Sequence, residues 1–256
     1  MNRYVTMLLS HSNNPAAATG IPRRQALKRS KGTPGEGMTP EHLFVIVAYV
    51  SIVIMSIVLH EVAHGWVAYR CGDDTAYLMG RLTLNPLKHV DLFMTILLPA
   101  MCIYMGFPAF GGAKPVPVNP YRLRRPGIDD RLVSAAGVAA NLAIALVLSA
   151  VLRLGLATRL LGPDSAGTTV LTLATVSNLL LFVFNLVPIP PLDGSRILRT
   201  FLPWEIRQVF NMLDRWGLII VFIAIQLPPL WAALDFVIAV LWRYVLGLPL
   251  GLLRGF

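Results

Sequence analysis

The chain has 256 residues, of which 55% are hydrophobic and only 14% are charged, against roughly 25% charged residues in an average soluble domain. So few charges could not cover the surface of a soluble protein, and lipid must therefore surround much of the chain. The net charge of +9 raises nucleic-acid binding as a hypothesis, but most basic residues lie between apolar runs and the sequence contains no nucleic-acid-binding motif. Basic loops between apolar segments are typical of membrane proteins, because their attraction to the anionic cytoplasmic leaflet sets the orientation of the protein. We therefore expect a lipid bilayer as partner and no nucleic acid.

The N-terminal region is polar until the first apolar run begins. Residues 1–38 contain a basic run with several prolines and glycines, and we expect a disordered basic tail there. Thr39 suits a helix N-cap, and Pro40 suits the first helical turn. From Leu43 to about Tyr69 an apolar segment follows that is long enough to span a bilayer as a helix.

Further apolar segments follow along the chain, separated by short polar loops. They cover Leu92–Phe110, Leu132–Leu156, Val170–Val187 and Trp216 to about Leu250, the last of which we expect to form two spans that part at Pro228-Pro229. We therefore predict an all-α polytopic membrane protein with five to six apolar segments. The short loops argue against a separate soluble domain, so residues 39–256 should form a single transmembrane domain.

The first apolar segment contains the motif HExxH, at His60-Glu61-Val62-Ala63-His64. Helical spacing places His60 and His64 one turn apart on one face, where both imidazoles can bind one zinc ion. Glu61 is offset from that face, so its carboxylate can reach a zinc-bound water and act as general base without being a ligand. Inserting a charged residue at the centre of a membrane helix costs about 2.5–3.5 kcal/mol of free energy. Ionisable residues within this apolar segment therefore indicate a functional site. The alternative, two histidines that bond to neighbouring helices, leaves the carboxylate unexplained.

A catalytic zinc ion normally has three protein ligands and one open position. The candidates for the third ligand are His89, Asp91, Asp193 and Asp235. We favour Asp193, because it follows an apolar span and a run of prolines that stops the helix, and irregular backbone at that depth is tolerated only against protein or water. A helix cap at the membrane surface is its alternative role. His89 and Asp91 lie in a more polar stretch, typical of ordinary loop residues.

Several motifs together resemble the site-2 protease family of intramembrane metalloproteases. They are the HExxH motif, Gly80–Asp91, Gly112–Pro120, Gly137–Leu142 and the run NLVPIPPLDG at Asn185–Gly194. The resemblance covers roughly residues 43–200, which we take as the core of the domain. It is closest to the compact bacterial branch, without PDZ or CBS domains. One departure is Val138, where many relatives carry proline.

The resemblance implies a function and a set of roles. The chain would be a zinc metalloendopeptidase that cleaves transmembrane protein substrates in regulated intramembrane proteolysis, in the bacterial inner membrane. One zinc ion per chain would be bound by His60, His64 and Asp193, with Glu61 as the base. Asn141 would orient the substrate or stabilise the oxyanion, although an interhelical hydrogen bond explains an asparagine at this position equally well.

Three other functions are alternatives to a zinc-dependent protease. A zinc transporter would need several intramembrane ligands along a pathway, whereas this sequence has one compact group with a base beside it. A catalytically inactive scaffold of the same fold stays open, although the motif residues that such decay would remove are present. A serine protease is disfavoured because the sequence contains no GxSxG motif.

The positions of the candidate ligands predict a topology. Leu43 and His60 are 17 residues apart, about 26 Å along a helix, so the zinc lies toward the far end of the first span. Asp193 also follows the far end of its span, so the two helices should run in the same direction. We therefore predict that Leu92–Phe110, interrupted by two prolines and a glycine, is re-entrant and returns to its starting side near the zinc.

The distribution of arginines predicts which side faces the cytoplasm. Four arginines follow the third candidate ligand and, by the positive-inside tendency, place that side in the cytoplasm: Arg196, Arg199, Arg207 and Arg215. The basic tail, residues 1–38, would then lie outside, which the same tendency disfavours.

Overall fold

The structure is a computed structural model that describes residues 39–106 and 111–253. The expected disordered tail, residues 1–38, lies outside the described residues. Within them every regular element is helical, which confirms the predicted all-α class. Four helices are long and apolar enough to cross a membrane, judged by length and composition: Pro40–Arg70, Pro126–Ala157, Ala166–Leu186 and Pro228–Val245.

The two ends of helix α3 (Pro40–Arg70) are set by an N-cap residue at its start and a glycine just after its end. The Thr39 hydroxyl accepts a hydrogen bond of 3.2 Å from the His42 amide, and Pro40 occupies the first turn, as the sequence predicts. Beyond Arg70, Gly72 has a φ of 107°, a conformation that favours glycine and lets the chain leave the helix. The helix has 31 residues, or about 46 Å, and so exceeds the roughly 30 Å of a bilayer's hydrocarbon core.

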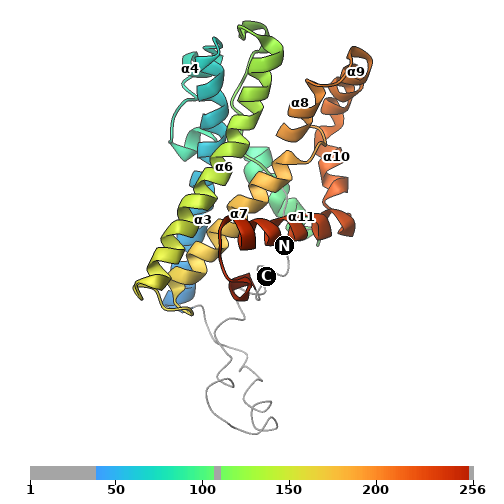
Figure 1. Ribbon diagram of the computed structural model, residues 1–256. Coiled ribbons are helices and arrows are strands. Elements are labelled where there is room, and N and C mark those ends of the chain that lie inside the picture. The colour runs from blue at the N-terminus through green and yellow to red at the C-terminus, as the bar shows by residue number, and fades with distance from the viewer. Residues whose placement is uncertain (1–38, 107–110, 254–256) are drawn as a thin grey trace, which may run out of the picture.

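Three long helices form the bundle that holds the site. Figure 1 shows α3 and α7 (Ala166–Leu186) running in one direction and α6 (Pro126–Ala157) in the other. Side-chain hydrogen bonds join α3 to α7, from Asn178 Nδ2 to Ser56 Oγ at 3.0 Å and between Tyr49 and Ser177 at 2.9 Å. Interhelical hydrogen bonds of this kind stabilise helix association in a membrane, where the hydrophobic effect does not drive helices together. The predicted common direction of the first span and Val170–Val187 is confirmed.

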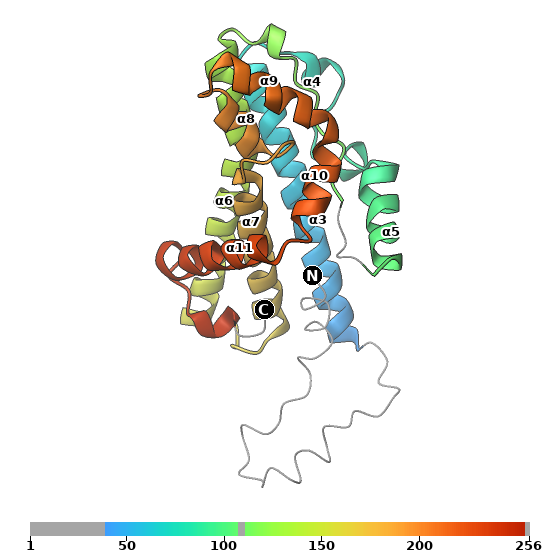
Figure 2. The ribbon, with the colours of Figure 1, turned by 90° about the vertical axis from the view of Figure 1, so that its right-hand side faces the viewer.

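The segment between α3 and α6 leaves the bundle and returns to the same end. It contains a π-helical turn, η3 (Leu92–Leu97), and the short helix α5 (Leu98–Tyr104), 6 and 7 residues long, about 20 Å together. Backbone bonds close its base, from Gly112 N to Met94 O at 3.0 Å and from Lys114 N to His89 O at 2.8 Å. Figure 2 shows α5 outside the bundle, on the side of α3. The predicted return of this segment is confirmed, except that residues 107–110 lie outside the described part.

The C-terminal region differs from the expected pair of spans. After α8 (Asp193–Arg199), α9 (Trp204–Leu213) and a 3-10 turn, η5 (Asp214–Trp216), helix α10 (Gly217–Ala224) has only 8 residues. It is about 12 Å long and cannot cross a bilayer, so the first of the two spans expected in 216–250 is wrong.

The predicted break at Pro228 is confirmed, because α11 (Pro228–Val240) begins there and continues into a π-helical turn, η6 (Leu241–Val245). Both views show α11 lying across the bundle (Figures 1 and 2). Its buried side chains, with Trp242, pack on α6 and α7 in the main hydrophobic core, which comprises Ala145, Leu152, Val176, Leu179, Val183, Leu234, Ile238, Trp242, Leu246 and Leu248. The chain closes with a 3-10 turn, η7 (Leu250–Leu253). Short helical turns α4 (Thr75–Leu78), η2 (Pro86–Lys88) and η4 (Pro120–Arg122) lie in the connection before α6.

The topology can be tested by labelling single cysteines in intact cells, in a chain whose Cys71 and Cys102 are replaced by alanine. Met79→Cys and Tyr121→Cys lie on either side of the re-entrant segment, at positions 62% and 97% exposed. We expect both to react from the same side of the membrane, and Leu160→Cys, in the turn between α6 and α7, from the opposite side. Labels at 79 and 121 on opposite sides would mean that the segment crosses the membrane.

Candidate metal centre

Two imidazoles project from one face of α3, one helical turn apart. His60 Nε2 and His64 Nε2 are 3.0 Å apart, and the two rings meet edge to face with centroids separated by 4.6 Å. His60 is buried and His64 half-buried. The i, i+4 spacing of the HExxH motif produces this arrangement, as the sequence predicts.

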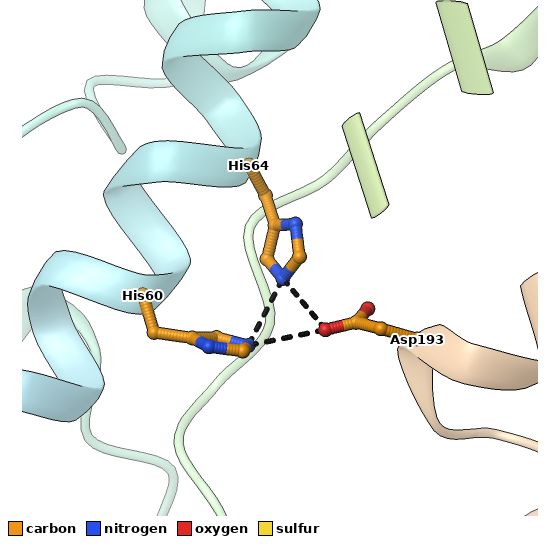
Figure 3. Close-up of side chains that lie close together, drawn as sticks. All are labelled: His60, His64 and Asp193. Atoms are coloured by element: carbon orange, nitrogen blue, oxygen red, sulfur yellow. Dashed lines mark hydrogen bonds and ion pairs between the residues drawn. The ribbon is translucent and has the colours of Figure 1, made fainter. Parts of the chain in front are cut away.

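Asp193 is the first residue of α8 and follows the proline-rich turn that ends α7. Its neighbour Gly194 packs so closely on the end of α7 that a Cβ atom would lie 2.2 Å from the Leu186 carbonyl oxygen. Glycine therefore lets α8 start directly against α7, at the level of the two histidines. Figure 3 shows the carboxylate facing both imidazoles, with Oδ2 3.4 Å from His60 Nε2 and 3.3 Å from His64 Nε2.

These three groups fit a zinc ion. Two ligand atoms of a tetrahedral zinc site, with bonds of about 2.0–2.1 Å, are about 3.3 Å apart. The separations of 3.0, 3.3 and 3.4 Å are close to that edge length. Asp193 Oδ2 is buried and has no hydrogen bond in the described part of the chain. Because lone pairs of two nitrogens and one oxygen converge there, a cation between them satisfies all three.

Helix α6 completes the surroundings of the two histidines. His64 Nδ1 donates a hydrogen bond of 2.7 Å to the Val133 carbonyl, which leaves the Nε2 lone pair free for a metal. One turn later, a Cβ atom on Gly137 would lie 2.3 Å from His64 Nε2 and 2.7 Å from His60 Cε1. Only glycine lets α6 approach the site this closely.

Glu61 has a different partner from its two neighbouring histidines. Its Oε2 accepts a hydrogen bond of 2.8 Å from the Val116 amide. Val116 lies in the segment that returns from α5 and runs along α3, where a Cβ atom on Gly65 would lie 2.7 Å from Val116 Cγ1. The half-buried carboxylate is thus held next to the histidines by a backbone group of the returning segment.

The other candidates for a third ligand lie elsewhere. His89 is buried in the connection before η3, where its Nε2 donates a hydrogen bond of 2.9 Å to the Thr83 carbonyl. Asp91 caps η3 by accepting from Met94 N at 2.8 Å, and Asp235 is exposed on α11. Among the described residues one group of histidine, cysteine and carboxylate side chains could hold a metal, and it consists of His60, His64 and Asp193.

Asn141 follows Gly137 by one turn on α6 and is completely buried. Neither its amide nitrogen nor its oxygen has a hydrogen-bond partner in the part of the chain that the structure describes. The interhelical bond considered as its alternative role is thus not formed there. Asn141 lies on the face of α6 that meets both histidines, and its unpaired amide can donate hydrogen bonds to a bound molecule.

Three groups that shape the site could not be identified as part of it from the sequence. The Val133 carbonyl and the Val116 amide are backbone groups, so no side-chain pattern marks them. Gly137 carries a weak signal, because it precedes Asn141 by four residues and therefore shares its helix face. That this face meets the histidines depends on how α6 packs against α3.

Comparison with known proteins gives a consistent identification. The family model described as Peptidase family M50 matches residues 48–160 and 163–225. A relative from Bacillus subtilis named "Putative zinc metalloprotease YwhC" is 40% identical over 180 residues, 69% of this chain and 78% of that protein. "Putative zinc metalloprotease Rip2" of Mycolicibacterium smegmatis is 36% identical over 69% of this chain and 66% of its own length. The Rip2 protein of Mycobacterium tuberculosis is 31% identical over 77% of this chain and 73% of its own length.

No solved structure gives a significant match to this chain. The metalloprotease names of the relatives and the geometry of the ligand group indicate Zn²⁺ as the cofactor. The four long apolar helices indicate an integral membrane protein. The family match, which covers well over half of the chain, and relatives above 30% identity lead to one conclusion: the chain belongs to Peptidase family M50, the site-2 protease family.

Proposed function

We propose that this protein is an intramembrane zinc metalloendopeptidase that hydrolyses peptide bonds of membrane-protein substrates. The observation that supports this most directly is a zinc-type ligand group between apolar helices, with the carboxylate of Glu61 next to it. His60 lies about 30 Å along α3, which is about 46 Å long, so a hydrocarbon core of roughly 30 Å centred on this helix includes it. A peptide bond that reaches this depth belongs most naturally to a membrane protein.

Each residue of the site has a role in this proposal. His60, His64 and Asp193 hold the zinc ion, which when bound polarises a carbonyl and lowers the pKa of a water molecule. The Glu61 carboxylate takes the proton of the attacking water and passes it to the leaving amine. The Val116 amide keeps that carboxylate in place through its hydrogen bond. The unpaired Asn141 amide orients the substrate or donates to the developing oxyanion.

The relatives and the charge distribution support a location in a bacterial inner membrane. The matched relatives come from bacteria. Arg196, Arg199, Arg207 and Arg215 lie on α8, α9 and η5, at the end of the bundle that carries Asp193. By the positive-inside tendency that end faces the cytoplasm.

The alternatives lack comparable support. A transporter needs several ligand groups along a path, and the described residues contain one. An inactive scaffold has no need to keep both the three ligands and the base.

The first test of the site is its zinc content. His64→Ala removes one ligand from a buried site, so the purified protein should lose its single zinc ion, as measured by elemental analysis. His89→Ala is the control, because it removes a histidine that is more deeply buried than His64 but lies in a loop outside the ligand group. If His64→Ala retains stoichiometric zinc, the ligand set is wrong.

The second test separates metal binding from catalysis. Glu61→Gln keeps the shape of the side chain but removes the base, so zinc content should stay at one per chain while cleavage falls by roughly 10²-fold or more. The measurement is hydrolysis of a transmembrane reporter in proteoliposomes. Normal turnover by this variant would overturn the mechanism, and an intact reporter with the unaltered enzyme would argue against the proposed substrate class.

The third test concerns the approach of α6. Gly137→Ala places a methyl group in contact with both imidazoles and should weaken zinc binding, measured as faster loss of the metal to a chelator. Gly127→Ala is the control, because a Cβ atom on Gly127 would meet no heavy atom within 4 Å. Equal rates of zinc loss in the two variants would show that α6 does not constrain the site.

A further inference from the structure

Helix α9 lies outside the bundle and across its end. Figure 1 shows it beside α8, and Figure 2 shows it above α10, into which the chain turns downward through η5. Among the described side chains of α9 none is buried. The helix is therefore attached by only part of its circumference.

The face that α9 turns outward is mostly apolar and carries one acidic side chain, Glu205, in its first turn. Ile206, Val209, Met212 and Leu213 recur at helical spacing, and their exposed fractions are 45%, 46%, 60% and 37%. A surface helix of a soluble protein turns such a stripe inward. The outward stripe thus indicates that an apolar phase lies beside α9.

The polar edge of α9 faces the protein. Arg199 of α8 donates to Asn211 Oδ1 at 3.2 Å and to Asp214 Oδ2 at 2.7 Å, just beyond the end of the helix. Arg207 is half-buried and donates to the Leu202 carbonyl at 3.1 Å. The bonds from Arg199 attach the end of α9 and the start of η5 to α8, and Asn211 lies on the side of α9 opposite the apolar stripe.

Exposed aromatic side chains lie before and after the stripe along the chain, and basic side chains lie near them. Phe201, Trp204 and Trp216 are 67%, 66% and 63% exposed, and tryptophan is enriched where a bilayer meets water. The Arg131 guanidinium lies over the Phe201 ring at 4.8 Å and remains partly exposed, and Arg215 is exposed as well. This combination of exposed apolar, aromatic and basic groups matches the boundary between acyl chains and anionic headgroups.

We propose that α9, together with Phe201 and Trp216, is an interfacial helix that docks on the lipid bilayer at the end of the bundle that carries Asp193. The apolar stripe lies among the outer parts of the acyl chains, and Arg131 and Arg215 contact anionic headgroups. The inference does not depend on proteolytic activity. Through Arg199 the docked helix is also bonded to α8, whose first residue is Asp193.

The test is the membrane depth of spin labels on single cysteines, in the full chain with Cys71 and Cys102 replaced by alanine. Labels at Val209 and Met212 report the apolar stripe, and one at Gln208 reports the polar edge. A label at Val147, 63% exposed on α6, is the reference for acyl chains. In nanodiscs of phosphatidylcholine and phosphatidylglycerol, the ratio of oxygen to nickel-chelate collisions at 209 and 212 should be several-fold higher than at 208 and approach that at 147.

The other outcomes overturn the proposal. A ratio at 209 and 212 that favours the nickel chelate would place the stripe in water. Protection of both positions from oxygen and nickel alike would mean that protein, such as a second copy of the chain, covers the stripe. In nanodiscs of phosphatidylcholine alone the labels should lie at a shallower depth, and an unchanged depth would refute the contact with anionic headgroups.

Discussion

The structure depends on the contact between two imidazoles of one helix and one carboxylate of another, deep among apolar helices. Ionisable groups at this depth are costly unless they are paired or bind a metal. His60, His64 and Asp193 reduce that cost by converging to separations of 3.0–3.4 Å. For this convergence α3 and α7 must run in the same direction and end at the same level, and the chain between them is arranged accordingly.

Glycine and backbone groups make the convergence possible. Gly194 lets α8 start against the end of α7, and Gly137 lets α6 touch both imidazoles. The Val133 carbonyl orients His64, and the Val116 amide holds Glu61. The re-entrant segment therefore has a chemical role besides its topological one, because its return past α3 supplies the amide that positions the proposed base.

The environment of the molecule explains its outer surface. Large exposed apolar side chains cover α3, α6 and α11, as lipid contact requires. The proposed contact of α9 with the boundary of the bilayer follows the same rule that apolar side chains face lipid. Arg199 bonds the polar edge of α9 to the protein, and the apolar stripe faces outward.

The sequence by itself determined the all-α class, the histidine pair, the parallel direction of α3 and α7 and the return of the segment after Leu92, because hydrophobic length, helical periodicity and proline positions are local properties. It favoured Asp193 among four candidates for the third ligand without placing it beside the histidines, and it predicted one span too many in residues 216–250. Only the tertiary structure decided these points. Which carboxylate meets the histidines depends on how α8 packs against the end of α7. That α10 stops after 8 residues, and that α11 lies across the bundle, depends on contacts between segments that hydropathy does not encode.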